Sequence, residues 1–135
     1  MLTNELIQEE LFKLMKKAQK KDEVPVSAII VSDNKIIAKA YNKVEEKKNF
    51  MSHAEIIVIN KAMKKKKNWR LDDCILYVSL EPCSMCKEII KKSRIKKVVY
   101  FIKQNSESTE KDTNVNYIEN QEMSDFLKLF FKDKR

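Results

Sequence analysis

The sequence predicts an α/β domain in which a mixed sheet carries helices on both faces. The predicted elements begin with a helix and a hairpin and then alternate between helix and strand. Two later segments, Ile75–Leu80 and Lys97–Ile102, are apolar runs of the kind found in buried strands. With 135 residues, 43% of them hydrophobic, the chain fits one domain with one core, and we expect residues 1–135 to form it.

Residues 3–20 are predicted to form an amphipathic helix, because apolar side chains recur along one face at helical spacing. Thr3 or Asn4 is expected to cap its first turn. Val-Pro-Val at 24–26 should end it, since proline interrupts a helix. The apolar face carries Ile7, Leu11, Leu14, Met15 and Ala18.

A hairpin follows, with strands at Val26–Ser32 and Lys35–Tyr41. The two strands meet at Asp33-Asn34, without the glycine that such turns usually contain. Since the chain has no glycine, left-handed backbone positions are expected to fall to asparagine, the next most tolerant residue. Residues 42–52 are predicted to be a polar loop.

The rest of the chain supplies three more helices. Apolar residues cover most of His53–Lys67, so the first part of this helix should be buried. Cys83–Ser93 is a shorter helix, and Gln121–Lys134 is an amphipathic one. Between the last two, 103–114 is a polar loop that we expect to be disordered, and Val115–Ile118 is a short strand.

Composition narrows the class of protein. Lys and Arg total 28 against 20 Asp and Glu, a net charge of +8 that suits a polyanionic partner. Codon usage in an A/T-rich genome would also enrich Lys, Asn and Ile, so charge alone leaves the partner open. No apolar run approaches the roughly 18 residues of a membrane span. The acidic, amphipathic N-terminus resembles no export signal, so we expect a cytoplasmic protein without a membrane partner.

The chemistry is concentrated in two short motifs, His53-Ala54-Glu55 and Pro82-Cys83-Ser84-Met85-Cys86. Alone, a histidine beside an apolar helix is more often structural, and a C-x-x-C pair can serve redox chemistry. Together, one imidazole and two thiolates form a three-ligand zinc set that leaves a fourth position for water, as in catalytic sites. Both motifs fall at predicted helix N-termini, which favour the thiolate. The third cysteine, Cys74, lies near neither motif, and three cysteines argue against a disulfide framework.

Glu55 is the expected general acid and base, because it lies two residues beyond the predicted zinc ligand. In isolation, a glutamate here could simply stabilise its helix end. A carboxylate beside zinc suits hydrolytic attack on an electron-poor carbon that bears an amino group. Zinc-dependent base deaminases carry this H-x-E…P-C-x-x-C pattern.

Further residues extend the pattern over most of the chain. They are Glu23-Val24-Pro25-Val26 before a strand, Asn42 eleven residues before His53, the run from Leu76 to Cys86, Ser93-Arg94-Ile95 before a strand, and Phe130-Phe131-Lys132. The chain therefore resembles the cytidine-deaminase-like superfamily, and within it the bacterial tRNA-specific adenosine deaminases.

This resemblance implies a three-layer α/β/α cytidine deaminase-like fold with a five-stranded mixed sheet, one Zn²⁺ per chain and a homodimer. It implies hydrolysis of the wobble adenosine of a tRNA to inosine. His53, Cys83 and Cys86 would bind zinc, and Glu55 would move protons. Asn42 and the backbone at Ala54 would hold the base, while Phe130, Phe131 and Lys132 would contact the anticodon loop.

Other interpretations stay open at this point. Asn42 could serve a turn, and Phe130 and Phe131 could be ordinary core residues. The 103–114 loop is short and lacks the family's glycine, Ser27 replaces another glycine, and Asn49-Phe50-Met51-Ser52 replaces an Asp-Pro pair. These departures motivate a second hypothesis, deamination of a free base or nucleoside of the guanine or cytosine type. A third is a non-catalytic RNA-binding protein with a structural zinc.

Overall fold

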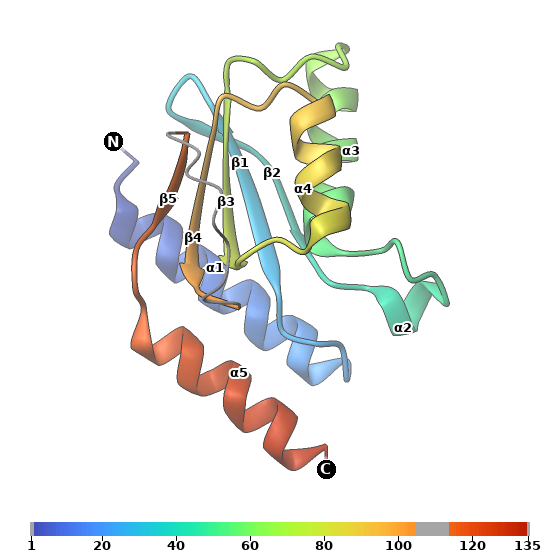
Figure 1. Cartoon of the computed structure of the whole chain (residues 1–135), viewed down its shortest axis with the longest axis vertical. Coiled ribbons are helices and arrows are strands. Elements are labelled where there is room, and N and C mark those ends of the chain that lie inside the picture. The colour runs from blue at the N-terminus through green and yellow to red at the C-terminus, as the bar shows by residue number, and fades with distance from the viewer. Residues whose placement is uncertain (1, 105–113, 135) are drawn as a thin grey trace.

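The computed structural model describes residues 2–104 and 114–134 and forms a three-layer α/β/α sandwich (Figure 1). Its strands lie in the order β2-β1-β3-β4-β5. The β1 strand is antiparallel to both β2 and β3, whereas β3, β4 and β5 are parallel, so the sheet is mixed. The predicted fold class is confirmed. In chain order the elements are α1 (Asn4–Lys20), β1 (Ser27–Ser32), β2 (Lys35–Tyr41), α2 (Val44–Lys47), α3 (Ala54–Lys66), β3 (Cys74–Leu80), α4 (Ser84–Lys92), β4 (Lys97–Ile102), β5 (Val115–Tyr117) and α5 (Gln121–Asp133).

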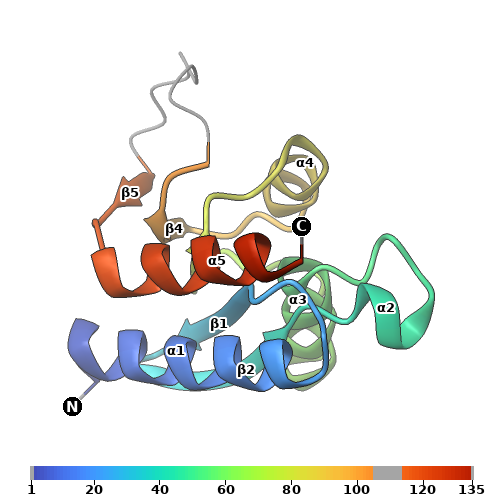
Figure 2. The same ribbon diagram turned by 90° about the horizontal axis from the view of Figure 1, so that it is seen from below.

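Two helices cover each face of the sheet. Figure 2 shows α1 and α5 side by side on one face, with α3 and α4 on the other. Phe12 of α1 and Phe126 of α5 are in ring contact at 5.3 Å, and the side-chain amide of Asn120 donates to Gln8 Oε1 at 2.7 Å. These contacts fix the C-terminal helix against the first one. Thr3 caps α1 as expected, its hydroxyl accepting from the Leu6 amide.

The core is divided by the sheet into two apolar clusters. Alternate residues of β1 face opposite layers: Ile30 packs with α3 and α4, while Ile29 packs with α1 and α5. Strands with both faces covered are apolar throughout, which explains the unbroken runs in β1 and β4.

The predicted hairpin is confirmed, and Asp33 and Asn34 both have positive φ, as a type I′ turn requires. The expectation that asparagine takes the left-handed positions is wrong for most of them. Among the described residues the others are Asp22, Lys48, Lys67 and Arg94. Lys48 and Lys67 each end a helix, where neighbouring contacts offset the cost of a β-carbon at positive φ.

The prediction for 42–52 is wrong in one respect, because this segment contains the short helix α2. The backbone amides of Glu45 and Glu46, in the first turn of α2, donate hydrogen bonds to the two carboxylate oxygens of Glu23. Because these contacts join segments more than twenty residues apart, no local sequence pattern predicts the helix. Of the loop predicted at 103–114, residues 105–113 lie outside the described part of the chain.

The other helices and strands confirm the predicted elements to within one or two residues at each end. Among the described residues, the helices include none with the length and apolar character needed to cross a bilayer.

Candidate active site

Three side chains from separate segments converge at one point. His53 Nδ1 lies 3.4 Å from Cys86 Sγ and 3.9 Å from Cys83 Sγ. The three potential ligand atoms all lie within 4.8 Å of one another. This is the cluster predicted from the two motifs, assembled across about thirty residues of sequence.

The ends of two neighbouring helices bring these side chains together. His53 is the N-cap residue of α3 and Cys83 is the N-cap residue of α4, and both have extended backbone conformations. Neither side chain caps its own helix, so both are free to point toward the shared centre. Cys86 follows within the first turn of α4, on the same side as Cys83. The parallel pair β3–β4 places this helix beside α3 on one face of the sheet (Figure 1).

The donor set fits zinc. Tetrahedral bonds of about 2.0–2.1 Å to nitrogen and 2.3 Å to sulfur place those atoms roughly 3.6 Å apart, close to both observed separations. The cluster contains three ligands and no fourth side chain among the described residues. Three protein ligands are the number that catalytic zinc sites use.

Glu55 lies beside this cluster and is only 4% exposed. Burial raises the pKa of its carboxyl group, while hydrogen bonds from its own amide and from the Cys86 thiol act in the opposite direction. A buried carboxyl group with a raised pKa is better suited to take up and release protons than a solvated one. Its surroundings therefore differ from those of a solvated glutamate at a helix end.

Burial also shifts the pKa values of two of the predicted ligands, Cys86 and His53. It raises the pKa of the Cys86 thiol, and the nearby charges of Glu55 and Cys83 act in the same direction. It lowers the pKa of His53, which favours the neutral imidazole. A neutral imidazole is the form that binds a metal, and a divalent cation is what would stabilise the Cys86 thiolate.

A cavity of about 560 Å³ opens onto the cluster. The cavity is lined by His53, Glu55 and Cys83 and also by Asn42, Phe130 and Phe131. Three of the residues expected to contact substrate thus share one cavity with the predicted zinc ligands. Ala54 and Lys132 are not among the residues that line it: Ala54 is fully buried, and Lys132 is exposed on the last turn of α5.

The two phenylalanines differ in their surroundings. Phe130 is 9% exposed, and its ring lies edge-on to Phe131 at 5.6 Å. Phe131 is 45% exposed. Of the two roles that the sequence left open, burial makes packing the main role of Phe130 and leaves the Phe131 ring available to a ligand.

The structure adds cavity-lining residues to which the sequence assigned no role in the site. Asp22, Glu23 and Lys134 also line the cavity. Lys134 Nζ donates to Asp22 Oδ1 at 2.9 Å and lies 5.6 Å from the centre of the Phe130 ring, which joins the end of α5 to the turn after α1. The sequence offered one weak signal, the acidic pair Asp22-Glu23 directly before Val-Pro-Val.

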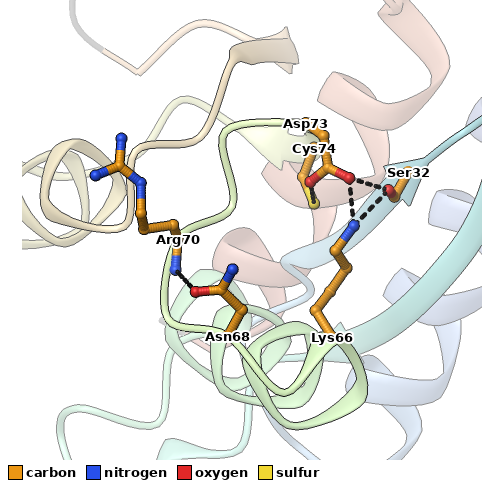
Figure 3. Close-up of polar contacts among 6 residues, drawn as sticks. All are labelled: Ser32, Lys66, Asn68, Arg70, Asp73 and Cys74. Carbon is orange, nitrogen blue, oxygen red and sulfur yellow. Dashed lines mark hydrogen bonds and ion pairs between the residues drawn. The ribbon is translucent and has the colours of Figure 1, made fainter.

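Cys74 belongs to a different group of residues at the start of β3, shown in Figure 3. It is fully buried, and its thiol contacts Asp73 Oδ1. The other Asp73 oxygen accepts from the Ser32 hydroxyl and from the Lys66 amine, which ties the end of α3 to the sheet. Burial raises the pKa of Cys74 to about 11, aided by Asp73, so this thiol stays protonated.

The fold and the three-ligand cluster together define a zinc deaminase domain, and comparison with known families agrees. Residues 1–102 match the family described as the cytidine and deoxycytidylate deaminase zinc-binding region. The chain belongs to this family, and zinc is its cofactor.

Individual proteins within this fold and family are also similar to the chain. The tRNA-specific adenosine deaminase of Bacillus subtilis is 44% identical over 100 residues, which cover 74% of this chain and 62% of that protein. The chain spans about three-fifths of the length of the bacterial relatives that it matches. A solved structure from work on A-to-I editing by tRNA:A34 deaminases has a TM-score of 0.73 and 30% identity, covering 82% of this chain and 95% of that one. Guanine deaminase from B. subtilis has a TM-score of 0.71 and 36% identity, covering 76% and 66%.

Proposed function

We propose that this protein hydrolyses the wobble adenosine of a tRNA to inosine. The observation that carries the proposal is the cavity that joins Glu55 and the metal cluster to Asn42 and the exposed ring of Phe131. The similarity to tRNA-specific adenosine deaminases supports the choice of substrate.

In this proposal His53, Cys83 and Cys86 hold one Zn²⁺, which supplies the Lewis acidity that makes a water molecule a better nucleophile. Asn42 and the backbone at Ala54 orient the adenine ring. Asn42 is buried in the cavity wall, and its backbone N–H donates to the Val26 carbonyl, so the side chain starts from a fixed backbone position.

Glu55 moves the protons that the reaction requires. Its carboxylate accepts a proton from the attacking water and passes it to the ring nitrogen next to the amino-bearing carbon. It then assists transfer of a second proton to the departing amine, so that adenosine and water give inosine and ammonia. The low exposure of Glu55 keeps bulk solvent away from these transfers.

The last turn of α5 is proposed to meet the anticodon loop. Phe131 offers an exposed ring on which a base can stack. The Phe130 ring packs edge-on against that ring. Lys132 adds positive charge for phosphates at the same helix end, whereas Lys134 is paired with Asp22. The net charge of +8 has the sign that such a partner requires.

The test is inosine formation by the zinc-loaded protein on a tRNA with adenosine at the first anticodon position. Wild type should produce inosine, and Glu55→Ala should produce none while keeping its zinc. Zinc-loaded wild type that makes no inosine in any tRNA of its own cell would refute the proposal. Stoichiometric zinc without deamination of any candidate substrate would instead indicate the non-catalytic hypothesis.

The second candidate is a free-base deaminase, favoured by the 36% identity to a guanine deaminase. The two functions differ in their response to salt. Binding through phosphates weakens steeply as salt rises, whereas a free base has no phosphates to lose. Ammonia release from guanine or cytosine that is insensitive to salt, with no affinity for tRNA, would favour this candidate.

We also propose that the chain forms a homodimer and acts in the cytoplasm. Support for a partner surface comes from β5, where Val115 and Tyr117 are exposed although both are large and apolar. Sedimentation at micromolar concentration should give twice the mass of the chain, and a monomer would contradict the dimer.

A further inference from the structure

We propose that Glu23 is a positioning residue for the substrate side of the active site, acting through the segment that links Asn42 to His53. This inference rests on the proposed function for its kinetic test, but its structural test is independent of the substrate.

Glu23 is a carboxylate that the fold has almost removed from solvent, at 1% exposure. One oxygen accepts from the Glu45 amide at 3.0 Å and the other accepts from the Glu46 amide at 2.7 Å. An ionised carboxylate has acceptors only, so it matches two parallel N–H donors. These two hydrogen bonds give the buried carboxylate oxygens their donors, and they also give the first amides of α2 their acceptors.

The segment held in this way spans the two sides of the active site. It starts directly after Asn42, in the cavity wall, and it ends directly before His53, in the metal cluster. The Lys43 amide donates to the Ser52 carbonyl at 2.9 Å, and this hydrogen bond ties the two ends of the segment together. Because the ends of the segment are tied together, we expect the position of α2 to determine the backbone direction directly after Asn42.

Glu23 is itself fixed by the end of α1. Its amide donates to the Ala18 carbonyl at 3.0 Å, and the preceding Asp22 has φ of 59°, which turns the chain sharply. A second contact repeats the link, since Lys21 forms an ion pair with Glu46 at 3.6 Å. One short turn therefore connects a helix on the far face of the sheet to the wall of the catalytic cavity.

Glu23 also has no direct part in the chemistry that the motifs define. It is outside the metal cluster, and its carboxylate oxygens are engaged with the amides of α2. Glu23 lines the same cavity as Asn42, but with both oxygens accepting from α2 we expect its effect on the reaction to pass through Asn42, which we propose to hold the adenine base. Loss of the anchor should weaken substrate binding more than the chemical step.

The test is Glu23→Gln, which keeps the shape but turns an NH₂ group toward one of the two amides. Asp73→Asn is the matched control, because it makes the same change in a hydrogen-bonded carboxylate at the start of β3, outside the cavity. Hydrogen exchange over residues 43–50 and kinetics on an anticodon stem-loop with a wobble adenosine are measured for both, with zinc content.

In Glu23→Gln we expect faster exchange at the amides of Glu45 and Glu46 and a KM raised about tenfold, with kcat changed less than about twofold and zinc retained. Asp73→Asn should leave all of these as in wild type. Unchanged exchange or an unchanged KM in Glu23→Gln would overturn the inference, and so would loss of zinc. An inactive wild type would refute the proposed function, while the exchange measurement would still decide whether Glu23 holds the segment.

Discussion

The adjacent rings of Phe130 and Phe131 at the end of α5 allow packing to be separated experimentally from the proposed contact with substrate. Phe130 is 9% exposed and Phe131 is 45% exposed, and the two rings touch. Replacing each with alanine removes the same number of atoms from two different surroundings. The pair is therefore an internal control for side-chain size and helix propensity.

Phe130→Ala should act mainly on stability. Truncating a buried phenylalanine costs about 3–5 kcal/mol, and the lower end applies because one side of Phe130 faces the cavity. For a chain of 135 residues, a loss of about 3 kcal/mol lowers Tm by roughly 10 °C. Phe131→Ala, with nearly half of its surface already in solvent, should lower Tm by no more than about 3 °C.

Binding should follow the opposite order once stability is taken into account. Stacking of a base on an aromatic ring contributes about 1–3 kcal/mol, so Phe131→Ala should weaken the affinity for an anticodon stem-loop by roughly 5–150-fold. Differential scanning fluorimetry and fluorescence anisotropy, at a temperature where both variants are folded, measure the two effects. Equal losses of Tm in the two variants, or unchanged RNA affinity in Phe131→Ala, would refute the division of roles.

Two further predictions concern the residues drawn in Figure 3. The Lys66 amine lowers the pKa of Asp73 to about 2, below the value near 3.9 expected in the unfolded chain, so this carboxylate stabilises the fold above about pH 4 and less as pH falls toward 2. Asp73→Asn should therefore unfold at lower urea concentration than wild type at pH 6, with the difference shrinking toward pH 2.5, and a pH-independent difference would contradict this. Cys74→Ala should keep one zinc per chain in metal analysis, because Cys74 lies outside the metal cluster; loss of zinc would show that the ligand set is wrong.

The candidate site could be predicted because its signals are local. His53 and Glu55 lie within one turn, as do Cys83 and Cys86, and both motifs come at helix starts that the sequence marks by itself. Only the fact that the two motifs meet in space required knowledge of the fold. The hairpin was also local, since Asp33-Asn34 between two apolar runs defines a turn even without glycine.

The walls of the cavity could not be predicted in the same way, because they depend on contacts between distant segments. Asp22 and Lys134 are 112 residues apart in sequence and meet only when α5 packs beside α1. The helix α2 has four residues, and its first turn donates two backbone hydrogen bonds to the Glu23 carboxylate, more than twenty residues earlier in the chain. The different exposure of Phe130 and Phe131 follows from the rotation of α5 against the sheet, which spacing alone does not give.

The most direct measurement of the central claim is X-ray absorption at the zinc edge of the purified protein, combined with metal analysis. We expect one zinc per chain, with two sulfur ligands at about 2.3 Å, one histidine nitrogen at about 2.0 Å and a fourth light-atom ligand from solvent. In His53→Ala the nitrogen ligand should disappear and zinc should be largely lost. A first shell with three or four sulfur ligands, or protein that binds no zinc when zinc is supplied, would contradict it.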